Sequence, residues 1–517
     1  METLERETEA AQQEPGVEPP DPGALPAWNV KELPAPVPFG WQSVLKAIGP
    51  GVILLGGSIG TGEWLMGPAV TVRFEGMMLW LATVAILLQS FLNTECIRYA
   101  LYTGEPVFTG YLRTRPGPRF WAIVYALCDA GMFLPAFVAS IASLLVAGWL
   151  GADRLPGPDH RMIIMWVGVA LSVICFVLML FGGKIYNMLL GCMTAKVLWV
   201  LVFLLFVDLF LVPWDKWAVL LRGFFFPFDE RGLMVPANLT LKDWATVAGF
   251  AAFAGAGGLS NATFSNYARE KGWGMGSLVG SIPSAVGGVK IDLAPIGTVF
   301  RVTEEAQRRW KLWWQHVHFD QYAVWVLGCF AGMMLPVAMS LQFVKPGEVN
   351  QIAIASMQAQ GISDAFAVHG AGLKMVFWYL TMFTGFLILW FTQVQVLDHV
   401  TRRWTDILWT GSETARTASG GAVQRIYYTI ASVYALMNCG MMVLLTFAGK
   451  TPFAILVITA VSSGFAMCVS SFHTLYVNRR FLPTPLRPCW WREAGLAGCG
   501  VFYLVMTCLA VSGQFIK

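Results

Sequence analysis

The fold can be predicted from one stretch of the sequence, Gly49-Pro50-Gly51-Val52-Ile53-Leu54-Leu55-Gly56-Gly57-Ser58-Ile59-Gly60-Thr61-Gly62-Glu63-Trp64. This stretch lies in an apolar segment long enough to cross a membrane, and the part from Gly56 to Glu63 holds four glycines and a carboxylate. A glycine costs about 1 kcal/mol relative to alanine in a helix interior, so the run predicts a helix that unwinds locally. Unwound backbone at membrane depth is tolerated only where it faces protein or a water-filled cavity. We therefore expect a binding site near Gly60 and Glu63.

A second apolar segment is interrupted in the same way. It reads Ala254-Gly255-Ala256-Gly257-Gly258-Leu259-Ser260-Asn261-Ala262-Thr263-Phe264-Ser265-Asn266-Tyr267 and is again rich in glycine and polar residues near its centre. Two matching breaks in the two halves of a membrane protein are the best sequence indication of a transporter's central site. The alternative is close helix packing through small residues. The candidate substrate-binding residues are Gly60, Glu63, Gly258, Leu259, Ser260 and Asn261.

Composition places the chain in a membrane. Of its 517 residues, 56% are hydrophobic and 13% are charged, whereas soluble proteins carry about 25% charged residues. The formal net charge is only +4 and the basic residues are dispersed, which gives no support for a nucleic-acid partner. The ten cysteines contain no C-x-x-C pair, so neither disulfides nor zinc is expected. Phosphate-loop, H-E-x-x-H and G-x-S-x-G motifs are missing, so we expect neither an enzyme nor a resident cofactor.

Apolar segments of about 20 residues, the length needed to span a bilayer, define the architecture. Eleven spans are predicted, at 43–72, 76–98, 119–150, 161–182, 187–212, 243–268, 319–343, 371–396, 424–449, 452–477 and 490–516. The sequence thus predicts an all-α membrane protein with discontinuous helices 1 and 6. With an odd number of spans per repeat, helices 1–5 (43–212) and 6–10 (243–477) fit two inverted repeats, followed by one extra helix at 490–516.

The N-terminal segment 1–40 is acidic and rich in proline, and we expect it to be a disordered cytoplasmic tail before a transmembrane domain at 41–517. Lys and Arg are more frequent on this tail and on the loops predicted to share its side. The positive-inside rule then predicts a multi-pass protein of the inner cell membrane, with its N-terminus in the cytoplasm and its C-terminus outside. The lipid bilayer is the expected partner.

Four ionisable or polar residues inside spans are further candidates. Glu63 should have a partner, because a charge at the bilayer centre costs about 2.5–3.5 kcal/mol; the alternative is a protonated acid in a packed interior. Asp129 in the third span is either a proton relay or a capped structural residue. Lys196 in the fifth span either replaces a coupling cation, or pairs with Glu63, or extends to the interface. Gln89 in the second span is a weaker candidate for the coupling pathway.

Several motifs resemble those of the Nramp divalent-metal transporters. Gly49-Pro50-Gly51, followed nine residues later by Gly60-Thr61-Gly62-Glu63, is similar to that family's G-P-G and D-P-G-N. Leu87-Leu88-Gln89 and the segment 98–104 resemble its L-L-Q and R-L-G-x-x-T-G. The resemblance covers most of the chain, with its sharp motifs in the first hundred residues. The family's M-P-H-N motif aligns with Gly258-Leu259-Ser260-Asn261 or with Leu259-Ser260-Asn261-Ala262, so its methionine is missing here.

This resemblance implies a LeuT-type fold with an ion site between helices 1 and 6. It also implies that Glu63 and Asn261 are metal ligands, assisted by carbonyl groups near Gly60 and Gly258. Oxygen ligands alone suit a hard ion such as Mg²⁺ better than Mn²⁺ or Fe²⁺. Asp129 corresponds to an acidic residue of the family's proton pathway, so protons are a further expected partner.

Two main hypotheses follow. The first is an Nramp-like secondary transporter that moves a divalent metal cation by alternating access. The alternative keeps the fold but has a small organic solute, such as an amino acid or amine, as substrate, with Lys196 in place of a coupling cation. A channel or a non-transporting receptor would keep the helical bundle without alternating access.

Overall fold

The computed structural model describes residues 17–40, 49–151, 154–180, 185–229, 231–280, 294, 296–344, 353–417 and 421–515. The helices of the first half are α3 (Pro50–Ser58), η1 (Gly62–Met66), α4 (Gly67–Phe74), α5 (Trp80–Thr103), α6 (Val107–Arg113), α7 (Pro118–Asp129), η2 (Ala130–Phe133), α8 (Ala136–Leu150), η3 (Pro158–His160), α9 (Arg161–Met179), α10 (Ile185–Leu211) and α11 (Trp214–Phe225).

The second half begins with η4 (Leu241–Asp243), α12 (Trp244–Phe253), α13 (Ser260–Lys271) and η5 (Gly274–Leu278). It continues with α14 (Glu304–His318), η6 (Phe319–Val326), α15 (Leu327–Phe343), α16 (Ile354–Phe366), η7 (Ala367–His369), α17 (Ala371–Gly411), α18 (Glu413–Arg416), α19 (Gly421–Phe447), α20 (Pro452–Phe481), η8 (Thr484–Leu486) and α21 (Trp490–Phe515). Two short parallel strands, β1 (Asn29–Val30) and β2 (Thr298–Val299), pair with each other.

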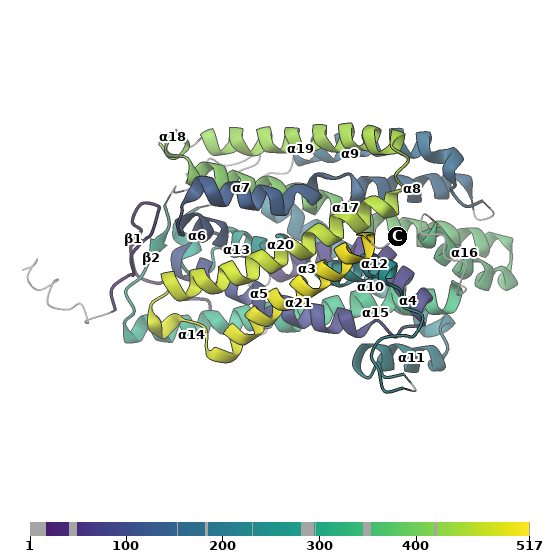
Figure 1. Cartoon of the computed structure of the whole chain (residues 1–517), viewed down its shortest axis with the longest axis horizontal. Helices are drawn as coiled ribbons and strands as arrows, with labels where there is room; N and C mark the ends of the chain where they lie inside the picture. The colour runs from purple at the N-terminus through teal and green to yellow at the C-terminus, as the bar shows by residue number, and fades with distance from the viewer. Residues whose placement is uncertain are drawn as a thin grey trace, which may run out of the picture.

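The molecule is a bundle of helices that run mostly along its longest axis (Figure 1). One end carries β1, β2 and α14, and the opposite end carries α11 and α16; we call them the strand end and the α11 end. In the described residues, nine helices are long and apolar enough to cross a membrane. The broken helices α3–η1–α4 and α12–α13 supply the first and sixth spans. The prediction of an all-α membrane fold with two discontinuous helices is confirmed.

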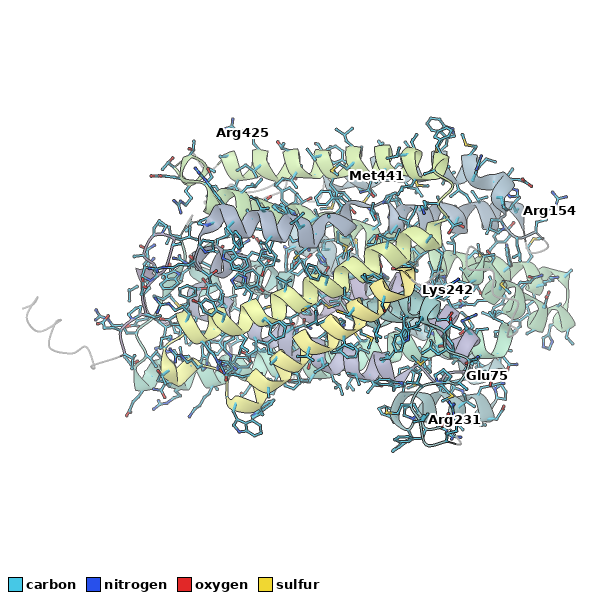
Figure 2. The ribbon with its side chains drawn as sticks, in the orientation of Figure 1. Glu75, Arg154, Arg231, Lys242, Arg425 and Met441 are labelled. Carbon is cyan, nitrogen blue, oxygen red and sulfur yellow. The ribbon has the colours of Figure 1, made fainter. Side chains whose placement is uncertain are left out.

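The lateral surface of the bundle is apolar, as a lipid-facing surface must be. Large hydrophobic side chains are exposed on the outward faces of α9, α10 and α19, among them Trp166, Val202 and Leu436. Soluble proteins rarely expose such contiguous apolar area. Figure 2 shows the labelled charged side chains Glu75, Arg154, Arg231 and Lys242 toward the α11 end, and Arg425 toward the opposite end.

Both predicted breaks are present. Helix α3 ends at Ser58, and regular helical structure resumes with the π-helical turn η1 at Gly62. Helix α12 ends at Phe253 and α13 starts at Ser260. Between them, Gly255, Gly257 and Gly258 have φ angles of +119°, +71° and +61°, which only glycine adopts without strain. The glycines of the sixth span therefore serve the break itself and not only close packing.

The first broken helix is held in place from a distant part of the chain. Asp320 of η6 accepts hydrogen bonds from the backbone amides of Gly49 and Gly51, at 3.3 and 2.8 Å. These amides are among the unpaired donors at a helix N-terminus, and a carboxylate there also matches the helix dipole. Helix α3 further packs against α10, α13 and α17, so the first half-helix is surrounded by elements of both halves of the chain.

Residues 17–38, which we call the N-terminal strap, correct the prediction of a disordered tail. The strap crosses the strand end: Val30 pairs with Val299, and the carbonyl groups of Leu33, Pro34 and Val37 contact side chains of α14. Its side chains Leu25, Trp28 and Leu33 are buried. Residues 1–16 of the predicted tail and 43–48 of the first predicted span lie outside the described residues.

Helix α17 is much longer than predicted. The sequence predicts a span at 371–396, but the helix continues to Gly411. Its last turns carry Asp398, His399, Arg402, Arg403 and Asp406, all of them buried. Charged residues usually end a span at the interface, whereas here acidic or basic groups of other helices surround them and let the helix continue.

Candidate functional site

A small cavity lies between the two breaks and one face of α17. Its volume is about 30 Å³, which leaves room for about two or three water molecules. The lining residues are Leu54, Gly57, Ser58, Thr61, Gly62, Met132, Phe137, Phe253, Gly255, Ala256, Ser260, Thr392, Gln395, Val396 and His399. Both breaks contribute to it, as the sequence predicts. Among the described lining residues, the polar side-chain groups are hydroxyls, one amide and one imidazole, without a carboxylate.

Lys196 of α10 does not extend to the interface but turns into the first break. Its ammonium group donates to the carbonyl oxygens of Gly56 (2.5 Å) and Ile388 (2.8 Å) and to the Thr392 hydroxyl (3.2 Å). A lysine ammonium has three N–H donors, so every donor has a partner. Two carbonyls and a hydroxyl around a positive charge form the kind of oxygen cage that also holds a metal cation. The lysine thus links α3, α10 and α17.

Glu63 bridges the two breaks. Its carboxylate accepts hydrogen bonds from the backbone amide of Gly60 at 3.0 Å and from that of Gly255 at 3.4 Å. The side chain is buried. Glu63 does not line the cavity, because both oxygens face backbone amides. The predicted partner of Glu63 is therefore mainly the backbone of the breaks themselves.

Gln89 and Asn261 hold the second break. The Gln89 Oε1 accepts from the backbone amides of Ala256 (3.0 Å) and Gly257 (3.3 Å) and from Asn261 Nδ2 (3.0 Å). Asn261 also donates to Asn93 Oδ1 at 2.8 Å. Both side chains are buried and neither lines the cavity. Their observed role is to satisfy unwound backbone, which would otherwise be costly at membrane depth.

The other predicted residues of the second break differ in position. Gly258 takes the left-handed conformation that starts α13, and Leu259 is buried in the core. Ser260 lines the cavity, where its hydroxyl lies 3.1 Å from His399 Nδ1. In the first break, Gly60 offers its amide to Glu63 and is not part of the cavity wall. Of the six predicted substrate-binding residues, the structure brings only Ser260 to the cavity.

Asp129 forms a buried ion pair. Its two oxygens accept from Arg403 Nε (2.8 Å) and Nη2 (2.6 Å), and Oδ2 also accepts from the Trp404 indole at 2.8 Å. Both charged side chains are about 1% exposed. This geometry corresponds to the structural alternative for Asp129. A role of Asp129 in a proton pathway stays a prediction. In the structure, its carboxylate is paired with the permanent positive charge of Arg403.

More ion pairs close the bundle between the cavity and the strand end. Arg402 pairs with Asp398 and Glu270, and Arg269 pairs with Asp406. Tyr267 and Tyr427 both donate to Asp398 at 2.7 Å. These groups join α13, α17 and α19 through residues that follow the cavity-lining part of α17.

The cavity wall that α17 contributes was not predicted from the sequence. Thr392, Gln395 and His399 follow one another at helical spacing and all line the cavity. The signal was present as Thr392-Gln393-Val394-Gln395-Val396-Leu397-Asp398-His399, a polar run at the end of a predicted span. Polar residues inside a membrane helix usually face the bundle interior, so this run indicates that α17 contributes to an internal site.

The described residues do not form a preassembled transition-metal centre. No group of three or more His, Cys, Asp or Glu side chains among them is placed to hold a metal ion. The proposed ligands Glu63 and Asn261 use their hydrogen-bonding groups on the protein itself, apart from Asn261 Oδ1, which is buried without a partner.

The elements together define a polytopic α-helical membrane protein with a small cavity between two broken helices. No protein-family model and no curated protein matches the chain. A crystal structure of a mutant of the Eremococcus coleocola manganese transporter matches with a TM-score of 0.60 at 12% identity, covering 94% of this chain and 90% of that one. The same transporter in complex with an aromatic bis-isothiourea substituted compound matches with a TM-score of 0.57 at 13% identity, covering 95% and 91%.

These likenesses show the fold. The chain has a divergent, Nramp-like form of the LeuT fold, as its sequence predicts. Both broken helices fit this fold, although the residues around the breaks differ from the family's motifs.

Proposed function

We propose that this chain is a secondary transporter that moves a small organic solute by alternating access through the cavity between its two breaks. The observation that carries the proposal is the position of the Lys196 ammonium group, which fills an oxygen cage at the first break. A fixed positive charge there takes the place that a coupling cation would otherwise hold, and it joins the first break to α10 and α17.

The cavity wall supports an organic substrate. It combines hydroxyl, amide and imidazole groups with the side chains of Met132, Phe137 and Phe253. Small-molecule sites in proteins are mostly apolar, with a few placed polar groups that fix orientation. A divalent cation would instead need several oxygen ligands and negative charge.

A divalent cation is the second candidate, and one observation favours it. Asn261 Oδ1 is buried without a hydrogen-bond partner, and the first-helix motif resembles that of metal transporters. The Lys196 ammonium opposes it, because its charge lies at the same break and repels a second cation. Glu63 would also have to leave the amides of Gly60 and Gly255 to bind metal.

Uptake by proteoliposomes distinguishes the two candidates. We expect the purified protein to take up members of a panel of neutral amino acids, amines and small amides, and we expect the variant Lys196→Met to lose that uptake. Uptake of Mg²⁺ or Mn²⁺ that Glu63→Gln abolishes, with no uptake from the organic panel, would contradict the proposal. The variant Cys489→Ser, at an exposed position outside the spans, is the control for handling and reconstitution.

A further inference from the structure

We propose that Gln395 and His399 recognise the transported solute, and that this solute is a small uncharged molecule bearing a primary amide or urea group. This inference rests on the proposed function and narrows its substrate class. It concerns the α17 wall of the cavity, which the resemblance to metal transporters does not assign.

Each of the two side chains has one polar atom without a hydrogen-bond partner. They lie four residues apart on α17, so they share one face of the helix, and both line the cavity. Gln395 Oε1 and His399 Nε2 are buried and have no hydrogen-bond partner in the described structure. A buried polar atom without a partner costs about 1–3 kcal/mol. Because both atoms belong to residues of one cavity wall, we infer that a ligand supplies the missing partners.

The orientation of Gln395 is fixed by its other amide atom. Gln395 Nε2 donates to the carbonyl oxygen of Ile53 at 2.7 Å, which assigns the oxygen to the opposite side. That oxygen lies against Gly57 at the first break: a Cβ on Gly57 would come within 1.4 Å of it. The Oε1 atom is therefore an acceptor that needs an N–H or O–H group from the solute.

The imidazole of His399 is fixed in a similar way. Its Nδ1 lies 3.1 Å from the Ser260 hydroxyl, at the start of α13, and Nε2 remains free. If Nδ1 donates to the hydroxyl, Nε2 is an acceptor; if the hydroxyl donates, Nε2 is a donor. A primary amide or a urea satisfies the pair in both cases, because it offers two N–H donors and one carbonyl acceptor.

The charges around the cavity select against ions. All three donors of the Lys196 ammonium are used, so it repels cations without offering an N–H to an anion. Glu63 already occupies the backbone amides of Gly60 and Gly255, which are the groups that would bind a carboxylate. A charged solute would enter without a direct counter-ion, whereas an uncharged amide meets both free atoms.

The size of the cavity and its apolar wall both agree with a small amide or urea as the solute. A cavity of about 30 Å³ has room for about two or three waters, which corresponds to a molecule of few non-hydrogen atoms. The rings of Phe137 and Phe253, with centroids 6.0 Å apart, form part of the apolar wall. They provide a surface for the flat face of an amide.

The test measures uptake of ¹⁴C-urea by proteoliposomes of the full chain, with empty liposomes to subtract passive leak. We expect saturable uptake that acetamide inhibits and that the charged isosteres acetate and guanidinium do not. The variants Gln395→Met and His399→Phe should each lower uptake by at least about tenfold. Gln393→Met is the matched control, because Gln393 lies on the same helix but not on the cavity wall, and it should keep most of the uptake.

Two results would overturn the inference. The first is equal competition by acetate or guanidinium in the wild-type protein, which needs no variant and so does not depend on how the variants fold. The second is unchanged urea uptake in both α17 variants. Uptake of amino acids or amines without any uptake of urea would contradict this inference but would agree with the proposed function. Uptake of divalent metal alone would contradict both this inference and the proposed function.

Discussion

Glu63 and Lys196 both contact the first break, and Glu63 also contacts the second. The carboxylate accepts from amides at the two breaks, and the ammonium donates to the carbonyl oxygen of Gly56 at the first break and to that of Ile388 in α17. Unwound backbone at membrane depth needs such partners. The two charged residues therefore supply hydrogen-bond partners to backbone groups at the breaks.

At this scale, Gly57→Ala should abolish transport. A Cβ at this position would lie 1.4 Å from Gln395 Oε1 and within 2.3 Å of the carbon that bears it, so the amide has to leave Ile53 or the break has to shift. Uptake of the organic solute is expected to fall to the level of empty liposomes.

The matched control is Gly191→Ala on α10, where a Cβ meets open space and transport should persist. Full activity of Gly57→Ala would show that the Gln395 side chain and the first break are not held as described.

Single residues were predicted unevenly. Glu63 and Lys196 stand out in the sequence because a charge among apolar residues is costly, and both lie at the first break. Gln395 and His399 did not stand out, since their chain neighbours Asp398 and Arg402 look like the start of a loop. Asn261 was expected to bind a substrate, but its amide is used on Gln89 and Asn93, which only the packing reveals.

Among the elements, α17 depends most on distant partners. Its final turns place Arg402 and Arg403 in the interior, where Glu270 of α13 and Asp129 of α7 neutralise them. A hydropathy window over the sequence ends the span before these charges, because local composition does not report which acidic residues lie near them in the fold. Element boundaries set by local apolar and glycine patterns, such as the breaks, were predictable. This boundary, set by long-range pairing, was not.

The ion pair between α17 and α7 should be strongly coupled. Arg403→Met leaves Asp129 buried without a counter-ion, and removing one partner of a buried pair costs about 3–5 kcal/mol. The melting temperature of the purified variant should therefore fall clearly.

The double variant Arg403→Met/Asp129→Leu should recover most of this loss, because an uncharged pair leaves no isolated charge. If the double variant is as unstable as Arg403→Met alone, the two residues do not act as a pair.

At the scale of the whole molecule, the N-terminal strap ties separate helices together at the strand end. Arg113 of α6 pairs with Glu105, donates to the carbonyl oxygens of Pro22 and Pro26, and lies 4.2 Å from the Trp28 ring centroid. Glu105 also accepts from the amide of Gly297 next to β2. The acidic, proline-rich composition of the strap suggested disorder. Its order comes from contacts with folded helices, which composition does not report.

Stability should depend on pH through Glu105, which lies between the second span and α6. Burial by itself would raise the pKa of Glu105, but the Arg113 guanidinium and the hydrogen bonds from Arg113, Tyr99 and Gly297 bring that pKa below its usual value of 4.5. A carboxylate with a lowered pKa stabilises the fold above its unfolded pKa, and the contribution is lost as pH falls through the folded pKa.

The melting temperature of the wild type should therefore fall more steeply than that of Glu105→Gln below about pH 4.5. Parallel curves for the two proteins over this range would contradict the role of Glu105 in holding the strand end.

The most direct test of the central claim is equilibrium binding of ¹⁴C-urea and ⁵⁴Mn²⁺ to the same preparation of purified protein. We predict saturable binding of urea that acetamide displaces and that Gly57→Ala removes, and no saturable binding of Mn²⁺. Saturable binding of Mn²⁺ that Glu63→Gln removes, together with no saturable binding of urea, would contradict the account.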